Sequence, residues 1–138
     1  MKPALIDTDI LSMFFKGNKK VKQNFKAYLD EYSEINFSII TYYEIISGLK
    51  HRDANKQMDL FMEFASQNNI ISVTTKSTRI SAKIYADLRK KGTPVDDIDL
   101  LIAGVALEND FIMVTNNTSH FARIEALKIE NWSLKKYY

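Results

Sequence analysis

Hydrophobic and polar residues follow two different spacings along the chain. Four short β-branched runs are typical of buried strands, PALID, INFSI, IISV and FIMVT, and IENWSL is a frayed candidate for a fifth. The segments between them carry apolar faces at helical spacing. These faces comprise Val21, Phe25, Tyr28, Leu29 and Tyr32; Tyr42, Ile45, Ile46 and Leu49; Met58, Phe61, Met62 and Ala65; and Ile80, Ile84 and Leu88. The alternation predicts a three-layer α/β/α fold with a central parallel sheet of four to five strands.

Composition narrows the class of protein. We expect one domain over residues 1–138, because 46% hydrophobic content can fill a single core. Without cysteine the chain has no disulfide scaffold, thiolate metal site or cysteine nucleophile. Neither a signal peptide nor a membrane span of ~18 apolar residues is present, so we expect a soluble protein of the cytoplasm. The glycine-rich phosphate loops GxGxxG and GxxxxGK[ST] are also absent, which argues against a nucleotide cofactor.

One aspartate directly precedes a segment with no polar side. LLIAGVAL, residues 100–107, predicts a fully buried helix, and Asp99 lies one turn before Ala103 at the edge of that interior. A carboxylate in such a place needs a partner, because an unpaired buried charge is costly. Capping of the helix, or solvation in a loop, is the simpler explanation for a lone aspartate.

Parallel topology adds other polar groups to the same place. The functional crevice of an open parallel sheet lies beyond the carboxyl ends of its strands. Residues that follow the predicted strands are Asp7, Thr8 and Asp9; Ser38 and Thr41; and Asn116 and Asn117. We assign Asp9 to the cap of the following helix and Asp7 to the site.

Glu44 has two interpretations. It lies nearly opposite the apolar face of its helix, where a glutamate is ordinarily solvated. Gly48, one turn further on, removes a side chain beside it at a helix cost of about 1 kcal/mol, and so leaves room for an ion or substrate.

Convergence of Asp7, Glu44 and Asp99 would require a cation. Two carboxylates 4 Å apart repel by about 4 kcal/mol at an effective dielectric near 20. Oxygen-only ligands select Mg²⁺ or Mn²⁺, and such an ion supports hydrolysis of phosphodiesters or phosphate esters. The two histidines, His51 and His120, are expected at the surface.

Four segments resemble, in order and spacing, the motifs of VapC-type toxins, the PIN-domain ribonucleases of type II toxin–antitoxin pairs. They are LIDTDILSMFF, SIITYYEIISGL, PVDDIDLLIAGVALENDFIMVTNN and TSHFARI. The resemblance implies a PIN fold, Mg²⁺- or Mn²⁺-dependent endoribonuclease activity, a homodimer and inhibition by a small VapB-like antitoxin. On the family's motifs, the metal ligands fall on Asp7, Glu44 and Asp99, with Asp96 and Asp97 as loop residues.

Asn117 departs from the family pattern, since many PIN domains have an aspartate there. An amide ligates a cation weakly, so we expect one metal ion, with Asn117 orienting water or substrate. The family implies cleavage by water to a 5′-phosphate and a 3′-hydroxyl, and structured RNA such as transfer RNA as the substrate.

Three clusters of cations could contact RNA, although runs of lysine are usually only solvated. They are Lys50, His51 and Arg52; Arg89, Lys90 and Lys91; and Lys135 and Lys136 among the potential stacking rings Trp132, Tyr137 and Tyr138. The amphipathic helices at 18–32 and 55–67 could serve as docking or dimer surfaces, and core packing explains them equally well.

Two other functions fit the acids. DTDIL also resembles the start of haloacid-dehalogenase-type phosphatases, with Asp7 as nucleophile, Asp9 as acid and DDID holding Mg²⁺. A non-catalytic interaction module would instead use the acids to bind a partner's arginine.

Overall fold

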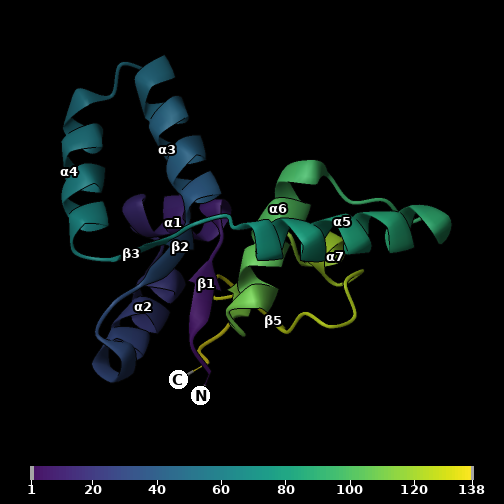
Figure 1. The fold of residues 1–138 in the computed structure, drawn as a ribbon. Coiled ribbons are helices and arrows are strands. Elements are labelled where there is room, and N and C mark those ends of the chain that lie inside the picture. The colour runs from purple at the N-terminus through teal and green to yellow at the C-terminus, as the bar shows by residue number, and fades with distance from the viewer. Residues whose placement is uncertain (1, 138) are drawn as a thin grey trace.

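A five-stranded parallel sheet forms the centre of the fold in the computed structural model, which describes residues 2–137 (Figure 1). The strand order is β3-β2-β1-β4-β5. The strands are β1 Ala4–Ile6, β2 Asn36–Ser38, β3 Asn69–Ile71, β4 Ile112–Val114 and β5 Ile129–Glu130. The predicted α/β class and parallel sheet are confirmed.

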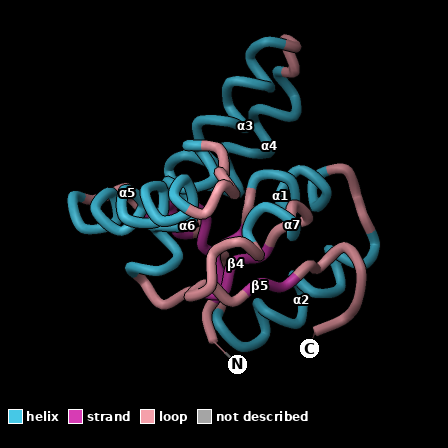
Figure 2. The backbone as a smooth tube through the Cα atoms, turned by 90° about the vertical axis from the view of Figure 1, so that its right-hand side faces the viewer, coloured by secondary structure: helices cyan, strands magenta, loops and turns pink. Residues whose placement is uncertain are grey.

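Helices cover both faces of this sheet. One face carries α1 Thr8–Phe15, α2 Lys19–Tyr32, α3 Ile39–His51 and α4 Asn55–Ser66; the other carries α5 Thr75–Lys90, α6 Asp97–Glu108 and α7 Thr118–Phe121. The α3–α4 hairpin projects beyond the sheet in both views (Figures 1 and 2). Within the described range, no helix has the length and hydropathy of a bilayer span.

Alternating side chains of the central strands supply two separate cores. In β1, Ala4 and Ile6 join the core beneath α1 to α4, whereas Leu5 joins the core beneath α5 to α7. In β4, Val114 joins the core beneath α1 to α4, and Met113 joins the core beneath α5 to α7. Successive residues of a strand point to opposite faces, so these strands are apolar throughout, as a doubly covered sheet requires.

The predicted buried helix is α6. Six of its residues are buried, and α5 packs closely along it. The close approach depends on Gly104, where an added Cβ would overlap Ser81 Oγ and lie 2.5 Å from the carbonyl oxygen of Ser77. Ser81 is also buried and donates a 2.7 Å hydrogen bond to the carbonyl of Leu100. Asp97, expected in a loop, is instead the first residue of α6, with Asp96 as its N-cap.

Two predicted strands differ from the observed ones. β3 begins at Asn69 and ends at Ile71, so its last predicted residues lie outside the sheet. β5 has only two residues, because the chain then turns to bury Trp132 in the core. Met62, predicted on a core face, is 42% exposed, since α4 packs through Phe61 and Ala65.

The C-terminal segment is tied to α2 by the buried Asn24. Its amide donates to the carbonyls of Trp132 at 3.1 Å and Lys135 at 2.8 Å, and its oxygen accepts from the backbone N–H of Tyr137 at 2.9 Å. The prediction that Trp132 stacks on RNA bases is therefore wrong, because the ring is fully buried. Tyr137 packs against the core, and Tyr138 lies outside the described residues.

Candidate active site

The candidate site lies where the strand order reverses at the carboxyl edge of the sheet. From β1 the chain proceeds to β2 on one side, and β4 adds on the other. Ligands of open α/β sheets bind at such a switch point. Asp7 directly follows β1 and Thr115 directly follows β4, so the two residues flank the crevice.

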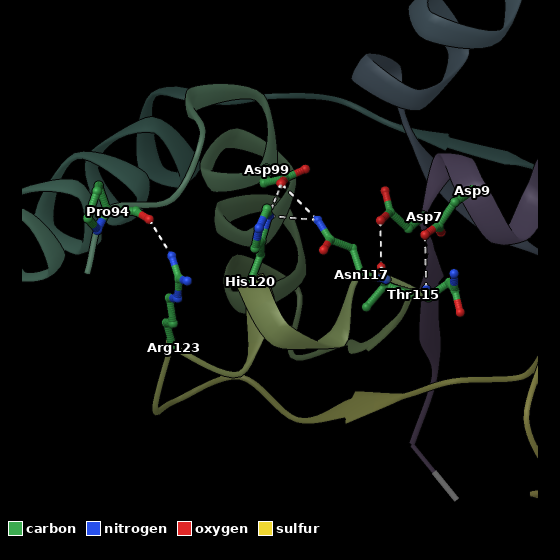
Figure 3. Close-up of polar contacts among 9 residues, drawn as sticks. Asp7, Asp9, Pro94, Asp99, Thr115, Asn117, His120 and Arg123 are labelled. Carbon is green, nitrogen blue, oxygen red and sulfur yellow. Dashed lines mark hydrogen bonds and ion pairs between the residues drawn. The ribbon is translucent and has the colours of Figure 1, made fainter.

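Asp7 is buried and held by two donors. Its carboxylate accepts from the backbone N–H of Thr8 at 2.8 Å. It also accepts from the hydroxyl of Thr115 at 2.7 Å (Figure 3). Burial, followed by the charge of Asp9, raises the pKa of Asp7 to about 7, against the opposing effect of the two hydrogen bonds. Asp99 lies on the same edge of the molecule, because Asn117 donates its backbone N–H to Thr115 Oγ1 at 3.0 Å and its amide to Asp99 at 3.3 Å. The charge of Asp99 contributes to the same rise in the pKa of Asp7.

Asp9 does not cap the helix as predicted. Asp7 is the N-cap of α1, and Asp9 lies within its first turn. The Asp9 carboxylate accepts from the backbone N–H groups of Ile10 at 2.7 Å and Asn116 at 3.1 Å. It therefore joins α1 to the end of β4, and burial raises its pKa.

Glu44 faces the site. It is half-buried, and the hydroxyl of Thr8 donates to its Oε1 at 2.6 Å, which excludes a fully solvated position. The space expected beside it is present, because Glu44 and Gly48 line a hollow of about 360 Å³ between α1, α3 and α4. A Cβ at Gly48 would meet only the tip of Arg52, at 3.4 Å.

Asp99 lies in the first turn of α6, one turn from the buried interior. The amide Nδ2 of Asn117 donates to its Oδ2 at 3.3 Å. Burial, then the charge of Asp96, raises the pKa of Asp99, and the charge of Glu44 acts in the same direction. Asp99 is neither the helix cap nor a loop residue, because Asp96 takes the N-cap position and Asp99 lies inside the helix.

His120 lies at the surface, as expected, and it also contacts residues of the site. Its ring is partly exposed, but Nδ1 lies 3.7 Å from Asp99 Oδ2 and 3.0 Å from Asn117 Nδ2 (Figure 3). A neutral ring accepts from the amide, and a protonated ring attracts the carboxylate. The three-residue spacing of Asn117 and His120, on one side of a helical turn, could have revealed this pairing. No comparable signal marks Thr115, which reads as an ordinary strand residue.

The donor set fits a hard divalent cation. No lysine or arginine among residues 2–137 forms an ion pair with Asp7, Asp9, Glu44 or Asp99. His120, beside Asp99, is the one basic side chain of the described residues at ion-pair distance from these acids, and the acids offer only oxygen atoms to an ion. No three acidic, histidine or cysteine side chains in that range already form a closed cage, because the acids bind hydroxyl and amide groups instead. To hold an ion, Asp7, Glu44 and Asp99 would therefore have to turn toward it.

The family follows from comparison with known proteins. The model of the PIN domain matches residues 4–127. The chain belongs to the PIN domain family. The resemblance drawn from the sequence motifs is thereby confirmed.

Named relatives of this PIN domain include VapC proteins. The tRNA(fMet)-specific endonuclease VapC of Shigella flexneri is 29% identical over 134 residues, which cover 96% of this chain and 100% of the relative. The protein of the same name from Salmonella typhimurium is 35% identical over 101 residues, covering 72% and 76% of the two chains. The crystal structure of DNA-bound VapBC from Salmonella typhimurium superposes with a TM-score of 0.85 at 29% identity, covering 96% of this chain and 99% of that one.

Proposed function

We propose that this PIN domain is the toxin of a VapBC-type pair and hydrolyses RNA as a Mg²⁺- or Mn²⁺-dependent endoribonuclease. The observation that carries the proposal is the gathering of Asp7, Glu44 and Asp99 at the switch point of the sheet. Thr8 contacts both Asp7 and Glu44, and Thr115 and Asn117 connect Asp7 with Asp99. The named relatives, which are VapC endonucleases, support the same activity.

The protein's part in catalysis is to position oxygen donors. Asp7, Glu44 and Asp99 would hold the ion, which when bound supplies Lewis acidity and lowers the pKa of water. Thr115 and Thr8 orient the carboxylates of Asp7 and Glu44. With a pKa of about 7, Asp7 is partly protonated in the free protein and becomes a full ligand on releasing that proton.

Asn117 limits the site to one ion in this proposal. Its amide fixes the carboxylate of Asp99 and also contacts His120, so it acts on the geometry of a ligand. Hydrolysis by water would give a 5′-phosphate and a 3′-hydroxyl. The substrate we propose is structured RNA, with transfer RNA first, because two relatives are named as tRNA(fMet)-specific endonucleases.

The partner we propose is a small VapB-like antitoxin, in the cytoplasm, with the toxin as a homodimer. Solved VapBC complexes with the same fold support the pairing. A small basic open reading frame beside the gene, whose product co-purifies with this chain, would be the corresponding observation.

The deciding experiment incubates the purified protein with total RNA in Mg²⁺, in chelator, and as Asp99→Asn. Asp97→Asn is the matched control, because Asp97 is exposed in the same helical turn. Discrete products from the wild type and the control in Mg²⁺ alone support the proposal. Intact RNA in every lane rejects the nuclease and favours the interaction module.

The phosphatase alternative conflicts with both family and geometry. Its acid, Asp9, would have to face the reacting phosphate, whereas its two oxygens accept from the backbone of Ile10 and Asn116. The chain also belongs to the PIN domain family and not to a phosphatase family.

A further inference from the structure

A second, larger hollow lies outside the candidate site. It measures about 670 Å³ and lies between α5, the end of α6 and the segment that follows α7. None of the four acids of the site lines it. Its apolar floor includes Ile80, Ile84 and Ile124.

The rim of this hollow is basic. Five basic and two acidic side chains line it, a net charge of +3, whereas the whole chain carries only +2. The basic residues are Lys76, Arg79, Lys83, Lys91 and Arg123. Positive charge is thus concentrated here, and the remainder of the molecule is on balance slightly acidic.

Within residues 2–137, three of these five cations, Lys76, Arg79 and Arg123, have no carboxylate at ion-pair distance. Lys83 lies 3.2 Å from Asp87 and Lys91 lies 3.8 Å from Glu125. Lys76 and Arg79 are exposed and, within residues 2–137, have no carboxylate at ion-pair distance. With Lys83 they form a stripe at helical spacing that extends about 10 Å along α5.

Arg123 connects this hollow with the segment that carries His120 of the candidate site. His120 lies beside Asp99, and Arg123 follows one helical turn later (Figure 3). The guanidinium of Arg123 donates a 2.6 Å hydrogen bond to the carbonyl of Pro94, in the loop that leads into α6. Arg123, which lines the hollow, therefore lies one turn away from a residue that contacts Asp99.

We propose that this basic hollow binds the sugar–phosphate backbone of the RNA substrate away from the cleaved bond. The proposal rests on the ribonuclease function. Acids in the crevice repel a polyanion, so cations outside it must supply much of the affinity, through phosphate contacts that release counterions. The apolar floor suits the unstacked faces of ribose and base. An acidic peptide would match the same charge, but the position of Arg123, one turn from the His120 that contacts Asp99, favours RNA.

The test compares two charge reversals of equal size. Lys76→Glu/Arg79→Glu alters the hollow, and Lys22→Glu/Lys26→Glu alters two exposed lysines of α2, on the opposite face of the sheet. Both pairs are made in the Asp99→Asn background, and binding of unfractionated transfer RNA is followed by fluorescence anisotropy at several salt concentrations. We expect the α5 pair to bind transfer RNA roughly tenfold more weakly, and the slope of log affinity against log salt concentration to be smaller by about two. The affinity of the α2 pair should stay within about twofold of that of its parent.

Active protein provides the second readout. The α5 pair should raise KM for transfer RNA and leave kcat unchanged, because no group at the carboxylates is altered. Thermal melting checks folding, and Lys76→Gln/Arg79→Gln replaces the reversal if that variant is unstable. Equal affinity of the two pairs overturns the proposal. The proposal is also overturned if the α5 pair still binds RNA normally but no longer binds a poly-glutamate peptide. That result would assign the hollow to an acidic peptide. Absence of cleavage by the wild type would count against the nuclease function, whereas the binding comparison judges the hollow separately.

Discussion

The hydroxyl of Thr115 donates a 2.7 Å hydrogen bond to Asp7 Oδ2, joining the ends of β4 and β1 across 108 residues of sequence. This bond favours the charged carboxylate and opposes the rise in the pKa of Asp7 that burial causes. Thr115→Val removes the donor at nearly constant volume. The pKa of Asp7 should rise further, so the pH profile of kcat/KM with Mg²⁺ should shift to higher pH.

Thr115→Ser is the matched control for this prediction, because it retains the hydroxyl. Its pH profile should follow that of the wild type. Identical profiles for the valine and serine variants would show that the hydrogen bond does not tune Asp7.

The stability of the metal-free protein should fall as pH rises from 4 to 8. Burial, with Asp9, raises the pKa of Asp7 from 3.8 to about 7, so between these values the folded chain holds a proton that the unfolded chain has released. The free energy of unfolding therefore decreases with pH across this window, by about 4 kcal/mol, and Asp7→Asn should remove that part of the decrease. Urea unfolding in chelator measures both proteins.

Mg²⁺ provides the complementary measurement. At pH 8 it should raise the urea midpoint of the wild type and have much less effect on Asp7→Asn, because a ligand of the folded state stabilises that state. For the pH dependence itself, the contradicting result would be a free energy of unfolding that changes with pH in the same way for the wild type and Asp7→Asn in chelator. Asp7 would then not hold a proton in the folded protein.

Gly104 and Gly48 should respond in opposite directions to alanine. At Gly104 a methyl group would collide with Ser81 and the Ser77 carbonyl, so α5 must move away from α6, and we expect a loss of about 1–3 kcal/mol. At Gly48 the methyl meets only the flexible Arg52, so the helix propensity of alanine should add up to about 1 kcal/mol. Urea midpoints of the two variants test this, and a change of the same sign in both would refute the close packing of α5 on α6.

Asn117→Asp should change the metal stoichiometry. The amide donates to Asp99 at 3.3 Å, and an aspartate would replace this attraction with repulsion between two carboxylates. Calorimetry with Mn²⁺ should give one ion for the wild type and two for the variant. Asn116→Asp is the control, since it adds equal charge one residue away and should leave one ion. Two ions on the wild type would rule out the single-ion site.

The sequence predicted those features that depend on repeating patterns. LLIAGVAL is apolar on every side and became the buried α6. Parallel topology placed Asp7 and Asp99 on one edge, where Thr115 and Asn117 connect them. The orientation of Glu44 could not be predicted, because it depends on how α3 packs against Thr8 of α1 and not on the periodicity of α3 alone.

Other contacts depended on single long-range partners. Trp132 is buried because Asn24 binds its carbonyl from α2, which no local pattern indicates. The helix α6 begins at Asp97, which we had expected in the preceding loop. Asp96 takes the N-cap position without a side-chain hydrogen bond. The metal-ligand roles of Asp7, Glu44 and Asp99 remain predictions, as does the single ion.

The placement of β4 beside β1 has a consequence for the order of events during translation. Asp7 and Glu44 leave the ribosome early, but Asp99, Thr115 and Asn117 belong to the last third of the chain. A nascent polypeptide therefore carries only part of the carboxylate set and lacks the strand that completes the crevice. On the proposed function, the cell would face an active toxin only when synthesis is nearly complete, which leaves time for a partner made beforehand to be waiting.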